Sequence, residues 1–279
     1  MTNLPPFTVL NSEVHLINSK SIEYDFQVSI VKPASYNPET GIDFPCLFVL
    51  DPGILQVMLA GISQYLNFTG FQEFITIGVG PKTPHPFGYY NDWLRESFCT
   101  RFRDYTPGTD ESVVKIVKDF FGYTGEFGGA SNYLQFIKNE IIPYVNEKYL
   151  IDNDDLSIMG HSMGGLFVLF TLFQEPDLFK QYVSLSPMLS YSNNSIFDIE
   201  ESFSLENKIL PKKLYLSIGS EEDSVLGKGA VSSVMHFADI LKSREFKEFK
   251  ICDRLFEGYS HNDVLPIAVV EALKFLYAT

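Results

Sequence analysis

The segment "DLSIMGHSMGGLFVLF", residues 155–170, constrains the fold of this chain more than any other. It joins a short apolar run at residues 155–160, typical of a buried strand, to an apolar segment with the character of a helix. Between them Gly160, Ser162 and Gly164 form the pattern G-x-S-x-G, in which a tight strand-to-helix turn holds a serine hydroxyl above the edge of a sheet. Such a turn is crowded and needs small residues two positions before and after the serine. The segment therefore predicts a strand, a nucleophile at Ser162 and a helix.

Strand-like and helix-like patterns alternate along the rest of the chain. Continuous apolar runs, which suit strands buried on both faces of a parallel sheet, span residues 44–50 and 74–80, and further strands are predicted at residues 182–186 and 213–219. Strands are also predicted at residues 24–33, where apolar and polar residues alternate, and at residues 248–256. Helical spacing of apolar residues recurs over residues 54–66, 133–150, 232–243 and 263–278. This alternation predicts an α/β fold of the α/β-hydrolase type, with a mostly parallel central sheet and helices on both faces.

Residues 81–132 interrupt this alternation. They are rich in Gly, Pro and aromatic residues and include the only tryptophan, Trp93. A connection of that length inside a compact domain is functional or forms a small insertion. We predict one α/β-hydrolase domain over residues 1–279, with a lid or pocket-wall insertion at about residues 81–132; a surface excursion without chemistry is the alternative.

Charge and cysteine content narrow the class of protein. The chain carries 21 Lys and Arg against 35 Asp and Glu, a formal net charge of −14, and no basic run that could neutralise a phosphate backbone, which argues against nucleic-acid binding. No apolar stretch approaches the roughly 18 residues of a membrane helix, and no secretory signal is visible. Cys46, Cys99 and Cys252 are an odd number without paired spacing, as expected of free thiols. We expect a cytoplasmic protein that binds neither nucleic acid nor membranes.

A serine hydroxyl needs a base within hydrogen-bond reach to act as a nucleophile at neutral pH. His261 stands in "FEGYSHNDV", a turn-forming segment between the last predicted strand and the last predicted helix, where strand ends collect. His236 lies in a predicted amphipathic helix, where a surface histidine is the simpler interpretation. The ring of His161 cannot easily turn back on the hydroxyl of its neighbour Ser162. Because α/β-hydrolases place the histidine after the serine and the acid, we predict His261 as the general base.

A carboxylate should orient the imidazole and stabilise its cation. The segment "KLYLSIGSEEDSV" supplies Glu221, Glu222 and Asp223 in the loop after a predicted strand. Ligand sites of open α/β sheets form at the carboxyl ends of strands, where this loop begins. We predict Glu222 as the acid, with Asp223 as the alternative and Glu221 exposed.

Two backbone amides are expected to bind the oxyanion, one directly after the nucleophile and one after an early strand. The first is that of Met163. For the second, "FVLDPGIL" offers Gly53 or alternatively Ile54, because Pro52 has no N–H.

Two further side chains are candidate substrate-binding residues. Arg103, in "RFRDYTP", can hold a carboxylate or phenolate, or alternatively form an ion pair with Asp104. His161 is placed in the same category because it adjoins the predicted nucleophile.

Several segments together resemble the bacterial putative-esterase family of α/β-hydrolases, which includes esterase D, the trilactone siderophore esterases and the mycolyltransferases. They are "VSIVKPASYNPETGIDFPCLFVLDPG", "RFRDYTPG", "GHSMGGLFVLFTLFQEPDLFKQYVSLSPMLSY", "LYLSIGSEED" and "SHNDV". The resemblance covers residues 19–277 and implies Ser162 as nucleophile, His261 as base and an acid near Glu222. The chain differs from family members at Pro52, where a glycine is frequent, and at "SPMLSYSNN", where many have "SPSLWW".

These patterns predict a serine hydrolase that cleaves carboxylic esters through an acyl-enzyme. The mechanism requires no metal and no organic cofactor, and the partner is a small-molecule ester. The resemblance implies a siderophore trilactone as one substrate class. The alternative enzyme activity is that of an acyltransferase or of a thioester hydrolase similar to S-formylglutathione hydrolase. The alternative from another class is a non-catalytic binding protein with the same fold.

Overall fold

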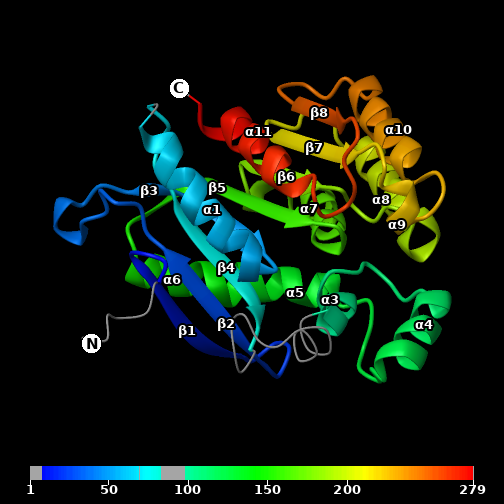
Figure 1. Ribbon diagram of the computed structural model, residues 1–279, viewed down its shortest axis with the longest axis horizontal. Helices are drawn as coiled ribbons and strands as arrows, with labels where there is room; N and C mark the ends of the chain where they lie inside the picture. Colours follow the sequence, from blue (N-terminus) through cyan, green and yellow to red (C-terminus); the bar gives the residue numbers. More distant parts are fainter. Residues whose placement is uncertain (1–7, 69, 83–97, 279) are drawn as a thin grey trace, which may run out of the picture.

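The computed structural model describes residues 8–68, 70–82 and 98–278, which form one eight-stranded sheet flanked by helices (Figure 1). The strands are β1 (Ser12–Ser19), β2 (Tyr24–Val31), β3 (Phe44–Leu50), β4 (Ile75–Pro81), β5 (Ile151–His161), β6 (Gln181–Leu185), β7 (Lys213–Gly219) and β8 (Lys250–Phe256). Their order in the sheet is β1-β2-β4-β3-β5-β6-β7-β8. β2 is antiparallel to β1 and to β4, and every other pair is parallel. The predicted α/β architecture is confirmed.

Helices cover both faces of the sheet because its central strands are buried on both faces. All seven residues of β3 are buried. On one face, Leu47 and Val49 pack with residues of α1 (Pro52–Asn67) and α11 (Leu265–Tyr277), which lie in front of the sheet in Figure 1. On the other face, Phe48 joins a larger cluster with helices that include α7 (Met163–Gln174), α8 (Tyr191–Glu206) and α10 (Ala230–Ser243).

Two predicted strands have the bounds that the sequence indicates, whereas β5 begins four residues before the predicted strand at residues 155–160. The predicted strands at residues 44–50 and 213–219 coincide with β3 and β7. The helix predicted at residues 133–150 is divided into α5 (Ala130–Phe136), a π-helical turn η3 (Ile137–Ile141) and α6 (Ile142–Lys148). Pro143 has no N–H for the α-helical ladder, so a change of hydrogen-bond pattern just before it is expected. The edge strand β1 and helix α8 are not predicted, because neither carries a continuous apolar run.

The predicted insertion contains helices in its described part. Residues 83–97, which include Trp93, lie outside the described residues. The rest contains α3 (Cys99–Asp104) and α4 (Glu111–Phe121), both on the side toward which the parallel strands point (Figure 1). Asp110 caps α4 by accepting hydrogen bonds from the next turn of backbone N–H groups. The function of the insertion as a lid or pocket wall stays a prediction.

The described residues bear on two further expectations. None of their helices combines the length and the apolar character that crossing a membrane requires. Cys46 and Cys99 are buried, Cys252 is half-buried, and all three are free thiols, as predicted.

Replacement of Phe167 tests the packing that holds α7 on the sheet. Phe167 is fully buried, with its ring centroid 5.3 Å from that of Tyr133 and 5.7 Å from that of Tyr105. We expect Phe167→Ala to lower the free energy of unfolding by about 3–5 kcal/mol, measured by urea denaturation, because it leaves a cavity in the core. The matched control is Phe120→Ala, at an 80% exposed position, which should change it by less than about 0.5 kcal/mol. Equal effects of the two variants would contradict the described packing.

Candidate active site

Ser162 lies in a strained turn between β5 and α7. Its backbone has φ 62° and ψ −116°, a conformation that residues other than glycine rarely adopt. The turn is held by hydrogen bonds: the N–H of Ser162 donates to the carbonyl of Leu185 (2.9 Å), and its own carbonyl accepts from the N–H of Met188 (3.2 Å). The sequence prediction of a tight strand-to-helix turn is therefore matched in its backbone geometry.

Close approach of backbone to backbone explains the glycines around this turn. A Cβ atom at Gly160 would lie 2.3 Å from the carbonyl oxygen of Gly164, and one at Gly165 would lie 2.9 Å from the carbonyl oxygen of Leu185. At Gly164 the nearest atom would be 3.4 Å away, an ordinary contact. The steric requirement thus falls on Gly160 and Gly165, not on the second glycine of the G-x-S-x-G pattern.

Glu222 lies beside His261 just beyond the carboxyl end of β7. Its side chain is fully buried, and one carboxylate oxygen accepts a 2.7 Å hydrogen bond from Nδ1 of His261. The other oxygen accepts hydrogen bonds of 2.6 Å from the backbone N–H of Gly219 and from the hydroxyl of Ser186. Because Nδ1 of His261 donates to Glu222, its Nε2 is the nitrogen that can accept a proton.

The other two acids of this loop have different surroundings. Asp223, the alternative acid, is exposed and accepts hydrogen bonds of 2.9 Å from the N–H groups of Gly229 and Val231, at the start of α10. These backbone donors lower the pKa of Asp223. Glu221 is exposed, as predicted. Of the three acids, Glu222 is the one in contact with His261.

His161 connects the Ser162 turn to the His261 loop. Its Nε2 lies 2.9 Å from the carbonyl oxygen of His261, to which it donates, and the two imidazole rings lie 4.4 Å apart between centroids. Burial, together with the neighbouring His261 and Arg101, holds the pKa of His161 well below its usual range. The ring is therefore neutral and supports the His261 loop; its predicted contact with substrate stays a prediction.

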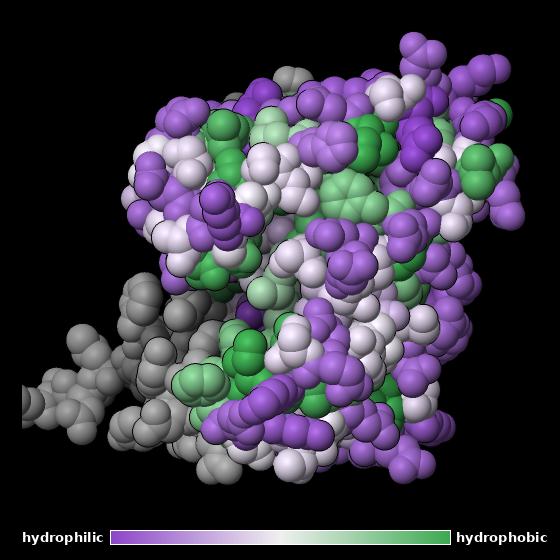
Figure 2. All heavy atoms as spheres, turned by 90° about the vertical axis from the view of Figure 1, so that its right-hand side faces the viewer, coloured by the Kyte–Doolittle hydropathy of each residue, from purple (hydrophilic) through white to green (hydrophobic). Residues whose placement is uncertain are grey.

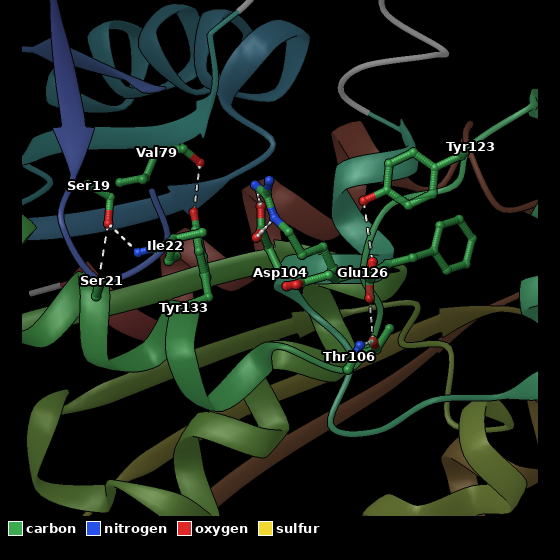
Figure 3. A network of polar contacts seen from close by, with 12 residues as sticks. Ser19, Ser21, Ile22, Val79, Asp104, Thr106, Tyr123, Glu126 and Tyr133 are labelled. Atoms are coloured by element: carbon green, nitrogen blue, oxygen red, sulfur yellow. Dashed lines mark hydrogen bonds and ion pairs between the residues drawn. The ribbon is translucent and has the colours of Figure 1, made fainter. Parts of the chain in front are cut away.

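Arg103 forms the ion pair with Asp104 that the sequence analysis gives as the alternative. Its Nε and Nη2 donate to the two carboxylate oxygens at 2.7 and 2.9 Å, and its guanidinium lies 4.1 Å from the centroid of the Tyr24 ring. Figure 3 shows Asp104 in the surrounding polar network, between Tyr133 and the segment of Thr106. Arg103 lines a cleft of about 1390 Å³ with Tyr24 and Tyr123. A substrate contact of Arg103 stays a prediction.

The two predicted sources of oxyanion-binding amides lie against each other. Met163 begins α7, and the turn between β3 and α1 holds Gly53 and Ile54. Gly53, at φ −14° and ψ −109°, departs from helical geometry within the first turn of α1. A Cβ atom at Gly164 would lie 3.5 Å from a carboxylate oxygen of Asp51, so this turn contacts the start of α7. Figure 2 shows the face toward which the parallel strands point, which is hollowed near its middle and carries hydrophobic residues around the hollow.

Comparison with known proteins identifies the family. The sequence profile of the family described as "Putative esterase" matches residues 19–262. The chain belongs to the putative esterase family. As a member of this family it is a carboxylic ester hydrolase with the α/β-hydrolase fold, as predicted.

Its relatives include named siderophore esterases. The ferri-bacillibactin esterase BesA of Bacillus subtilis is 29% identical over 278 residues, which cover 96% of this chain and 90% of the relative. The siderophore triacetylfusarinine C esterase of Aspergillus fumigatus is 31% identical over 212 residues, 73% of this chain and 65% of the relative. The crystal structure of the BES protein from Bacillus cereus superposes with a TM-score of 0.81 at 25% identity, and covers 100% of this chain and 99% of that one.

Two buried polar residues of the esterase are not singled out by sequence reasoning. Ser186 holds the carboxylate of Glu222, and Arg101 donates from Nη2 to the carbonyl of His161 at 3.0 Å. Both lie in segments that carry the family resemblance, "VSLSP" and "RFRDYTP". In the sequence, each of these polar residues has apolar or aromatic neighbours, which indicates that it can be buried. The sequence does not indicate which partner the buried residue contacts.

The neutral ring of His161 should make the stability of this esterase depend on pH. Below about pH 6.5 the unfolded chain binds a proton at this histidine and the folded chain does not. Stability therefore falls as the pH falls, by at most about 1.4 kcal/mol per pH unit from this residue. The free energy of unfolding, measured with urea at a series of pH values, should depend less steeply on pH for His161→Gln than for the wild type between about pH 5 and pH 6.5. Near pH 8 the two proteins should show the same dependence on pH. Equal slopes at all pH values would show that His161 takes up its proton at the same pH in the folded protein as in the unfolded chain, and would contradict the lowered pKa.

Proposed function

We propose that this esterase acts through a triad of Ser162, His261 and Glu222 and through an acyl-enzyme intermediate. The observation that carries the proposal is the contact of Glu222 with Nδ1 of His261 at 2.7 Å, in a buried site where Ser186 and Gly219 also donate to the carboxylate. An ionised carboxylate that accepts three hydrogen bonds is well suited to stabilise the imidazolium that forms when histidine takes a proton.

The chemistry follows from these groups. Nε2 of His261 removes the proton of the Ser162 hydroxyl as its oxygen attacks the ester carbonyl. The resulting oxyanion is bound by the backbone N–H of Met163 and by that of Gly53 or Ile54. Collapse of the intermediate breaks the ester bond, and the leaving alcohol takes the proton from His261. Water then repeats the sequence with the acyl group on Ser162 and releases the acid.

We further propose a siderophore ester as the natural substrate class. The support is the similarity to relatives that are named for ferri-bacillibactin and triacetylfusarinine C. Transfer of the acyl group to another acceptor, or hydrolysis of a thioester, would use the same three residues and differ only in the acceptor or leaving group. Product analysis with trilactone, thioester and simple ester substrates separates these possibilities. Failure to cleave enterobactin-like trilactones, with cleavage of simple esters, would overturn the siderophore proposal alone.

Three variants test the triad with p-nitrophenyl esters of graded acyl length. We expect Ser162→Ala to lower kcat by about 10⁵–10⁶-fold and Glu222→Gln by about 10³–10⁴-fold, because a glutamine cannot stabilise the imidazolium. The matched control is Asp223→Asn, which removes the adjacent exposed carboxylate and should leave kcat within about twofold, as for a surface substitution away from the chemistry. Loss of activity in Asp223→Asn with retention in Glu222→Gln would reverse the assignment of the acid.

A further inference from the structure

Helix α3 directs one buried cation at the turn that holds Ser162. The side chain of Arg101 is 10% exposed, and its Nη2 donates to the carbonyl of His161, the residue that precedes Ser162, at 3.0 Å. Its Nε lies 3.0 Å from a carboxylate oxygen of Asp51, which directly follows β3. One guanidinium thus joins the ends of two neighbouring strands, β5 and β3.

Asp51 has an unfavourable backbone conformation, which is held by side chains of α3 and of the residue that follows it. Its φ of 51° and ψ of 58° place it in the left-handed region. Its N–H donates to the hydroxyl of Tyr105, the fully buried residue that follows α3, at 3.3 Å. Burial raises the pKa of the Asp51 carboxyl, and Arg101 and Tyr105 oppose that shift. The turn therefore depends on α3 for its charge partner and for a backbone hydrogen bond.

The same turn carries the second candidate oxyanion amide. Gly53 follows Asp51 by two residues, and a carboxylate oxygen of Asp51 lies next to the start of α7, 3.5 Å from the position of a Cβ at Gly164. A movement of Asp51 would therefore change the separation between the Gly53 or Ile54 amide and the Met163 amide. Both amides must lie within hydrogen-bond distance of one oxygen atom.

We propose that Arg101 is a positioning residue for the oxyanion hole. By bridging Asp51 and the carbonyl of His161, it sets the distance between the β3–α1 turn and the nucleophile turn. The inference rests on the proposed function, because it assigns a role to the same oxyanion-binding amides.

The chemistry of the side chain favours positioning over general stabilisation. A buried ion pair has a large desolvation cost and is often no more stable than a packed apolar pair. Arg101 donates one hydrogen bond, from Nη2 to the carbonyl of His161, and its Nε forms an ion pair with Asp51 without hydrogen-bond geometry. A rigid, planar guanidinium fixes the relative positions of these two partners, whereas a lysine ammonium is a point charge on a flexible chain. Arg101 to lysine keeps the charge and loses this geometry, which makes it the informative substitution.

The experiment measures kcat and KM for a p-nitrophenyl ester with Arg101→Lys, Asp51→Asn and the double variant. We expect each single variant to lower kcat by about 100-fold with KM within about threefold, since a displaced donor weakens only the transition state. The double variant should lose little more than either single variant, because the pair acts as a unit. The pH dependence of kcat/KM should keep the midpoint of the wild type, because the contact of Glu222 with His261 is untouched.

The matched control is Arg244→Lys, which alters another arginine–carboxylate pair away from Ser162, between a half-buried arginine and a buried glutamate. Arg244 binds Glu200 through Nε and Nη2 at 2.9 and 2.8 Å. This variant should keep kcat within about twofold, as expected of a substitution away from the chemistry. Reaction with a fluorophosphonate, counted as label per chain at completion, corrects kcat for any unfolded fraction of each variant.

Three results would overturn the inference. They are an unchanged corrected kcat in both single variants, a loss confined to KM, and a double variant whose loss is the product of the single losses. If instead the wild type hydrolyses no ester and takes up no fluorophosphonate, the proposed function fails, whatever the variants do.

Discussion

A fully buried carboxylate is the constraint around which the candidate active site is built. An isolated charge in the interior is costly unless hydrogen bonds replace its lost hydration. Glu222 receives three such bonds, from Gly219 at the end of the preceding strand β7, from Ser186 after β6 and from His261 after β8. The three donors must be present together, so the positions of three loops are coupled through one side chain.

The order of the strands makes this coupling possible. β5, β6, β7 and β8 are neighbours in the sheet and run parallel, so their carboxyl ends meet at one edge (Figure 1). Each of these strands is followed by one residue of the candidate site: β5 by Ser162, β6 by Ser186, β7 by Glu222 and β8 by His261. Asp51 follows β3, the neighbour of β5 on the other side. A parallel sheet thus places the proposed nucleophile, base and acid at one edge without any one loop having to be long.

Helix α3 adds a second set of polar contacts to the same edge. Its two arginines lie two positions apart and reach different partners: Arg101 contacts the turns after β3 and β5, and Arg103 contacts Asp104 and the ring of Tyr24 in β2. The helix therefore links the antiparallel hairpin to the nucleophile turn.

The amino-acid sequence by itself determined the features that depend on neighbours in the chain. The strands predicted at residues 44–50 and 213–219 became β3 and β7, and the small residues around Ser162 indicated the turn that the structure contains. Tertiary structure alone decided which carboxylate meets His261 and what Arg101 holds. Glu222 and Asp223 are adjacent acids in one loop, and they differ only in the donors that surround them. Those of Glu222 come from Ser186 and His261, 36 and 39 positions away, and reach it only when the strands are assembled.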